Sequence, residues 1–168
     1  MKHFLIFLLF LFISREAFPQ GFNNAFGIRA GHSSGLEYRH YFSDEFSVKA
    51  LAATRTRDGG VQLHALAEFY EYDLFPFAYQ LVFYYGFGGH AGYETWKEEQ
   101  TGNGSPQQVM RSSFLAGIDG VVGVEYLFYK APLIAGLELK PYFDVYGGDG
   151  WIDAVIPWDI AFTVKFLF

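Results

Sequence analysis

The feature that most constrains this chain is the strict alternation of its last nine residues, "IAFTVKFLF". Large apolar side chains occupy every second position from Ile160 to Phe168, and a mixed set, Ala161, Thr163, Lys165 and Leu167, lies between them. Successive side chains of a β-strand point to opposite faces, so this stretch is a strand with one aromatic, apolar face. A fold built from such strands has to cover that face with protein or place it in an apolar medium.

The same period of two recurs along the chain, in segments separated by turn residues such as "DGG" at 58–60. Short connections and the absence of helical periodicity favour an antiparallel meander, and an even number of strands can close without leaving an edge. We therefore predict a single domain over residues 21–168, of the all-β class, that forms a closed eight-stranded antiparallel up-and-down transmembrane β-barrel. The predicted strands cover residues 25–32, 36–42, 46–57, 61–72, 80–96, 114–128, 133–146 and 154–168.

Residues 1–20 are set apart from this pattern. A short start with Lys2 precedes an unbroken apolar run at 4–13, and a more polar stretch leads to Gln20. This is the layout of a secretory signal peptide, and the run is too short for a transmembrane helix. The chain has no cysteine, which excludes both a disulfide framework and a lipid-modified N-terminal cysteine.

The polar faces of the predicted strands carry basic and acidic residues in equal number, which indicates mutual pairing in a narrow interior. The basic ones are Arg29, Arg39, Lys49, Arg55, Arg57, Lys140 and Lys165, and the acidic ones are Glu37, Glu68, Asp119, Glu125, Glu138, Asp144 and Asp159. We interpret these side chains as an interior polar network that serves mainly as structural ion pairs.

Alternation alone does not say which face points outward, because a soluble lipocalin-like carrier shows the same period with the faces exchanged. Aromatic residues make up 21% of the chain and charged residues only 18%. A nearly continuous aromatic face would aggregate in water, whereas in lipid it forms an apolar band with interfacial girdles. With the export signal, this favours the membrane arrangement, in which Lys97–Ser113 is a long outward loop.

The final stretch "FTVKFLF", with its terminal Phe168, resembles the C-terminal signature of outer-membrane β-barrel proteins. The strand count, the signal peptide and the turns are similar to small eight-stranded barrels related to the transmembrane domain of outer-membrane protein A. "GIDGVVGVEY" and "LKPYF" are similar to segments of exported barrels without a known function. The resemblance implies an outer-membrane location in a Gram-negative bacterium, contact with outer-membrane lipid, and recognition of Phe168 by the barrel assembly machinery. Pro141 and Pro157 depart from it and predict bulges or rims.

One enzymatic interpretation stays open. His32 and Ser34 share a parity near a rim, and a serine beside a histidine is the core of nucleophilic acyl transfer. The pair is similar to the His-x-Ser of outer-membrane lipid A deacylases, which implies a third, acidic residue such as Glu37. The asparagine that follows the serine in that motif is missing here, and the alternative interpretation is a histidine beside a serine turn.

No cofactor or metal is expected. His40, His64 and His90 are judged to differ in parity and depth, so a shared ion is not predicted. A formal net charge of −6 without a basic patch excludes a nucleic-acid partner. The expected role is therefore that of an integral outer-membrane barrel with a structural or surface-interaction function and an unknown extracellular partner. A lipid-modifying enzyme and a soluble carrier are the alternatives.

Overall fold

The computed structural model describes residues 22–55, 60–102, 105–128, 130–146, 154–156 and 158–168. These ranges contain strands and turns, and no helix long and apolar enough to cross a membrane. The strands are β1 (Asn24–Gly31), β2 (Ser33–Ser43), β3 (Phe46–Arg55), β4 (Gly60–Glu71), β5 (Leu81–Gly102), β6 (Ser105–Phe128), β7 (Leu133–Leu139), β8 (Tyr142–Tyr146), β9 (Ala154–Ile156) and β10 (Ile160–Leu167). The predicted signal peptide lies outside the described residues.

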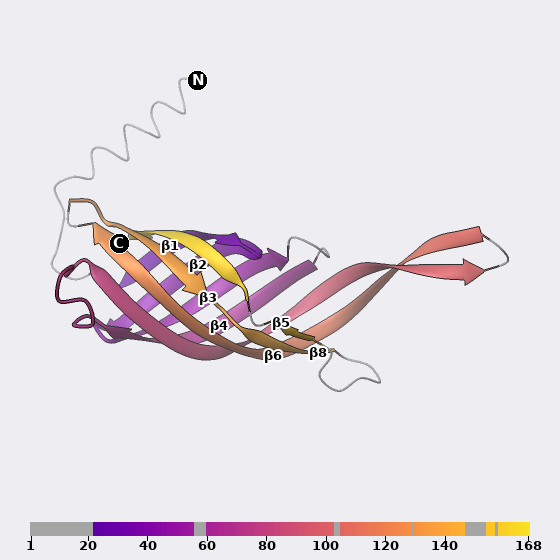
Figure 1. Cartoon of the computed structure of the whole chain (residues 1–168), viewed down its shortest axis with the longest axis horizontal. Helices are drawn as coiled ribbons and strands as arrows, with labels where there is room; N and C mark the ends of the chain where they lie inside the picture. Colours follow the sequence, from indigo (N-terminus) through magenta and orange to yellow (C-terminus); the bar gives the residue numbers. More distant parts are fainter. Residues whose placement is uncertain (1–21, 56–59, 103–104, 129, 147–153, 157) are drawn as a thin grey trace, which may run out of the picture.

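The strands form a closed antiparallel barrel. Consecutive strands pair from β1 to β6, β1 pairs with β10, β10 with β7, and β7 with β6, which closes the ring (Figure 1). Strands β7 and β8 pair with successive parts of β6 and so occupy one position in the wall. Strand β9 pairs with β8 and β10 pairs with β7, so β9 and β10 also share one position. The ten strands therefore form a wall of eight. The predicted fold class is confirmed.

Two predicted strands are divided. Segment 133–146 is split into β7 and β8 at Lys140 and Pro141, since proline cannot donate a hydrogen bond to the ladder. Lys140 N donates instead to Asp159 O at 2.9 Å, and Gly120 N donates to Pro141 O at 2.9 Å. Segment 154–168 is split into β9 and β10, and Pro157, the second predicted irregularity, lies outside the described residues. The prediction of two continuous strands was wrong, whereas the irregularity at Pro141 is confirmed.

The segment 97–113 is not the loop that the sequence predicts. Strands β5 and β6 continue through it as a paired ladder that reaches Gly102 opposite Ser105. Strand β4 begins at Gly60, which lies opposite Glu94 of β5. Over the described residues, the part of β5 beyond Glu94 therefore pairs with β6 alone. Figure 1 shows this ladder as a long hairpin that leaves the barrel at the end opposite the start of β1 and the C-terminus. We call the two ends of the barrel the hairpin end and the terminal end.

The barrel carries its apolar side chains outside. Ile28, near the middle of β1, is 55% exposed, and Leu63, Phe87 and Leu137 are exposed to a similar degree. Exposed aromatic residues also lie at both ends: Tyr72, Phe77 and Tyr79 follow β4 at the terminal end, and Tyr93 and Trp158 lie towards the hairpin end. The outside of the wall is thus apolar and rich in aromatic side chains.

Candidate functional site: the interior polar network

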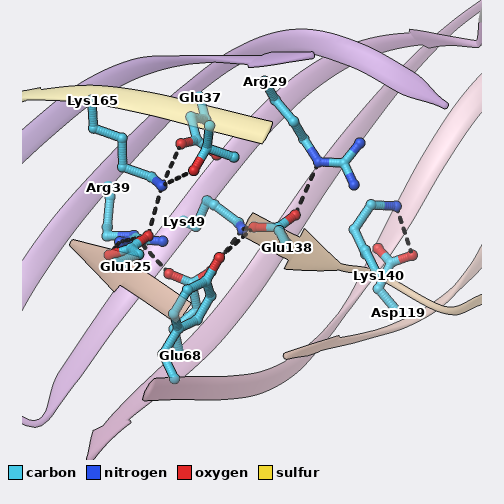
Figure 2. A network of polar contacts seen from close by, with 12 residues as sticks. Arg29, Glu37, Arg39, Lys49, Glu68, Asp119, Glu125, Glu138, Lys140 and Lys165 are labelled. Carbon is cyan, nitrogen blue, oxygen red and sulfur yellow. Dashed lines mark hydrogen bonds and ion pairs between the residues drawn. The ribbon is translucent and has the colours of Figure 1, made fainter. Parts of the chain in front are cut away.

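The charged side chains assigned to the interior lie where the alternation puts them. Every member of the predicted network except Arg55 and Arg57 is at most 4% exposed. The side chains of Arg55 and Arg57 lie outside the described residues. The buried members come from all parts of the wall, and most of their ion pairs join strands that are not neighbours. Figure 2 shows a connected series of ion pairs from Lys165 to Arg29, with Lys140 and Asp119 as a separate pair beside it.

The terminal-end half of the network alternates in charge. Lys165 Nζ lies 2.9 Å from Glu37 Oε1 and 2.7 Å from Glu125 Oε1. Arg39 joins the same Glu125 through Nη1, at 2.9 Å, and Glu68 through Nε, at 2.7 Å. Each cation lies between two carboxylates, which offsets the cost of removing these charges from water.

The series continues through Lys49 and Arg29. Lys49 Nζ contacts Glu68 Oε1 at 2.7 Å and Glu138 Oε2 at 2.6 Å. Arg29 Nε lies 2.9 Å from Glu138 Oε1, and its Nη2 lies 3.1 Å from Asp159 Oδ1. Up to Glu138 the lumen therefore holds four cations and four glutamates, a neutral set.

Aromatic side chains fill the space around these ions. Tyr84 Oη donates to Glu138 Oε2 at 2.8 Å, and the Arg39 guanidinium lies over the Tyr84 ring at 5.2 Å. Tyr84 fits because its neighbour across β6 is Gly123, where a Cβ would approach the Tyr84 ring atoms to 2.5 Å. Tyr70 and Tyr84 also belong to a buried apolar cluster with Leu66 and Val82. Side chains thus fill the lumen around these ions, and a cavity of about 220 Å³, lined by Tyr41, Tyr70 and Glu125 among others, opens towards the terminal end.

The next charges lie beside the interruption of the wall at Pro141. Lys140, which precedes the proline, places Nζ 3.3 Å from Asp159 Oδ2 and 3.8 Å from Asp119 Oδ1. Asp159 also accepts a hydrogen bond from Ser33 Oγ at 2.5 Å. These contacts connect the neutral half to a second group of residues towards the hairpin end.

That second group contains His64 and His90, which were expected to differ in parity and depth. His64 and His90 are directly opposite each other on β4 and β5, with ring centroids 5.0 Å apart. Nδ1 of each ring lies 2.9 Å from a different oxygen of Asp119, and His90 Nε2 lies 3.0 Å from Asp144 Oδ1. The expectation that these two histidines lie at different depths was wrong. The register of β4 and β5 places them side by side, and the alternation of residue types does not encode that register.

The predicted arrangement of His32, Ser34 and Glu37 does not form. Ser34 Oγ donates to Gly31 O at 3.0 Å and accepts from Gly31 N at 3.1 Å, as in a local turn. Glu37 lies on the opposite face of β2, inside the barrel, where it pairs with Lys165. The geometry therefore offers no acid to His32 from Glu37, and that part of the enzymatic interpretation was wrong.

Phe168, the predicted assembly signal, lies at the terminal end. Its N donates to Asn24 O at 2.9 Å, and its O accepts from Asn24 N at 3.1 Å. Its side chain is 53% exposed. The backbone of Phe168 thus completes the pairing of β1 and β10, while its ring lies outside the barrel core.

The fold is similar to a known barrel. No protein-family model and no curated protein matches the sequence. A solved structure that it resembles is the crystal structure of the N-terminal β-barrel domain of Pseudomonas aeruginosa OprF. The likeness has a TM-score of 0.54 at 16% identity and covers 89% of this chain and 100% of that chain. The chain thus has the fold of this barrel domain.

Proposed function

We propose that this protein is an integral outer-membrane β-barrel of a Gram-negative bacterium with a non-enzymatic role in envelope structure or surface contact. The observation that carries the proposal is the inverted polarity of the wall. Leu63 and Phe87 face outward while Lys49 and Glu138 are fully buried. Lipid solvates such an exterior, whereas water would drive it to aggregate.

The filled lumen argues for a structural role. Ion pairs and tyrosines occupy the terminal-end half, and an eight-stranded barrel is only wide enough for its own side chains. The same filling speaks against a soluble carrier, which needs an apolar cavity. The separation of Ser34 from Glu37 gives no support to a lipid-modifying activity.

The protruding part of β5 and β6 is the surface that we propose for extracellular contact. In barrels of this kind the long connections lie outside the cell and the short turns face the periplasm. The start of β1 and the C-terminus lie at the end opposite the hairpin (Figure 1), and we therefore propose that the hairpin points away from the cell. We further propose that residues 1–20 direct export as a signal peptide, that the assembly machinery inserts the barrel, and that outer-membrane lipid surrounds it.

The location is tested by expressing the chain with its own leader in a Gram-negative host and separating the membranes. We expect the protein in the outer-membrane fraction, with a gel mobility that changes when the sample is boiled. A short epitope inserted at residues 103–104 should be detected on intact cells, and the matched insertion between Asp44 and Glu45 should not. Recovery in the soluble periplasm without a heat-dependent shift contradicts the proposal.

A further inference from the structure

His64, His90 and Asp119 bring three potential metal ligands together inside the barrel. All three side chains are at most 5% exposed, and their ligand atoms lie within 4.8 Å of one another. We propose that this cluster binds a divalent first-row transition-metal ion, with Zn²⁺ as the type. The ligands are Nδ1 of His64, Nδ1 of His90 and a carboxylate oxygen of Asp119. Imidazole and carboxylate are ligands that such ions accept in proteins.

The contacts of His90 are those of a ring that can bind an ion. Its Nδ1 lies 2.9 Å from Asp119 Oδ1, and its Nε2 lies 3.0 Å from Asp144 Oδ1. A doubly protonated ring would donate to both carboxylates, whereas a ring that binds a metal ion through Nδ1 keeps its proton on Nε2, beside Asp144. A histidine that binds a metal usually has such a carboxylate beside its other N–H.

Two of the distances between the ligand atoms are close to those around a bound ion. Zinc lies about 2.0–2.2 Å from nitrogen and oxygen ligands, so ligand atoms around it are about 3.3 Å apart. The two distances between Asp119 oxygens and Nδ1 atoms are 2.9 Å, so they would lengthen by a few tenths of an ångström. Gly117, opposite His90, leaves space for that ring, since a Cβ there would lie 2.5 Å from His90 Cε1.

His64 contributes a further observation. Its Nε2 is buried and has no hydrogen-bond partner among the described residues. Among the described residues, the contact of His64 Nδ1 with Asp119 is therefore the polar contact that orients this ring. Lys140 does not take the place of the ion beside Asp119, because its Nζ is nearer to Asp159 Oδ2, at 3.3 Å, than to Asp119 Oδ1, at 3.8 Å.

The test uses the full folded protein, purified in detergent and freed of metal with a chelator. Zn²⁺ is titrated by calorimetry, and Co²⁺ is followed by its visible absorption, which distinguishes a four-coordinate protein site from the hydrated ion. We expect one Zn²⁺ per chain and a Co²⁺ spectrum of four-coordinate type. His64→Gln, His90→Gln and Asp119→Asn should each weaken binding more than tenfold, and Asp144→Asn, which alters the outer carboxylate, about tenfold.

His40→Gln is the matched control, since His40 Nδ1 contacts Asn24 at 2.8 Å, away from the cluster. This variant should bind like the wild type. Folding of each variant is checked by circular dichroism, and where a variant does not fold, the wild-type Co²⁺ spectrum decides. A wild type that shows no stoichiometric binding or only hydrated Co²⁺, or folded His64→Gln and His90→Gln proteins with unchanged affinity, overturns the proposal. Binding is measured on purified protein, so this result is independent of the outer-membrane proposal.

Discussion

Lys49 Nζ on β3 lies 2.6 Å from Glu138 Oε2 on β7, although β3 and β7 are not neighbours in the wall. The pair therefore spans the lumen, and both side chains are fully buried. Glu138 also receives Arg29 at 2.9 Å and Tyr84 Oη at 2.8 Å, so four separate strands meet at one carboxylate. Such cross-lumen contacts hold opposite sides of the barrel at a set distance.

Lys49→Met should destabilise the barrel by about 3–5 kcal/mol, because it leaves Glu68 and Glu138 without one of their cations in a buried site. The double variant Lys49→Met/Glu138→Gln should lose less than the sum of the single variants, since it removes both members of the pair. The free energy of unfolding in urea, measured in lipid vesicles, gives these values. Lys130→Met, at an exposed turn position, is the control and should change stability by less than about 0.5 kcal/mol. Additive losses would contradict the pairing.

Gly123→Ala should cost about 1–3 kcal/mol, because the new methyl group would meet the Tyr84 ring at 2.5 Å and its hydroxyl at 2.6 Å. In combination with Tyr84→Leu the alanine should cost much less, since the clash is removed. Gly120→Ala is the matched control on the same strand, where the nearest atom would be Pro141 Cγ at 3.4 Å. The same unfolding assay applies, and equal costs for the two alanines would show that Tyr84 does not determine the need for glycine.

The alternation of the chain was enough to predict the closed barrel and the face on which each charge lies. Arg39 and Glu125, for example, are inside because each has the parity of the small and polar residues of its strand. Parity does not say which inward residues meet. That depends on strand register, and the turns between Glu71 and Leu81 set His64 opposite His90 in a way that local patterns do not encode.

Two other differences have local causes. The stretch from Lys97 to Ser113 has no apolar alternation, because a hairpin that leaves the barrel has no core to face. Its pairing is carried by the ladder between β5 and β6 and was missed for that reason. Pro141 interrupts its strand and turns Lys140 towards Asp159, a contact between residues that are distant in sequence. Neither side chain alone indicates this contact.

Ile28→Arg should destabilise the barrel by about 2–4 kcal/mol, the cost of a basic side chain near the middle of the lipid-facing band. Phe42→Arg, at the terminal end of β2, should cost about 0–1 kcal/mol, because its charge can reach the interface. Both residues are exposed, so a barrel in water would tolerate both changes equally. Unfolding in vesicles of defined composition measures the difference, and equal costs at the two depths would argue against a membrane-embedded wall.

Replacing residues 98–109 by a short turn between Lys97 and Met110 should leave the barrel folded. Those residues pair with each other in the described ladder and not with the wall strands. We expect the heat-dependent gel shift to remain and the free energy of unfolding to change by less than about 1 kcal/mol. Surface detection of an epitope in the new turn would then separate folding from any contact made by the hairpin itself. Loss of folding would show that the hairpin is part of the barrel's stability.

Phe168→Ser should reduce assembly in cells without reducing stability in a purified system. The contacts that Phe168 makes with Asn24 are backbone hydrogen bonds, which serine keeps, and the aromatic ring is 53% exposed. If the ring is the signal read by the assembly machinery, the amount of folded protein in the outer membrane should fall several-fold, while refolding into vesicles and the unfolding free energy stay within about 1 kcal/mol of the wild type. Phe166→Ser, an apolar-face change in the same strand, is the comparison that separates a terminal signal from a general loss of exterior hydrophobicity. Equal assembly defects in the two variants, or a matching loss of stability for Phe168→Ser, would assign the ring to the apolar exterior of the wall instead of to recognition.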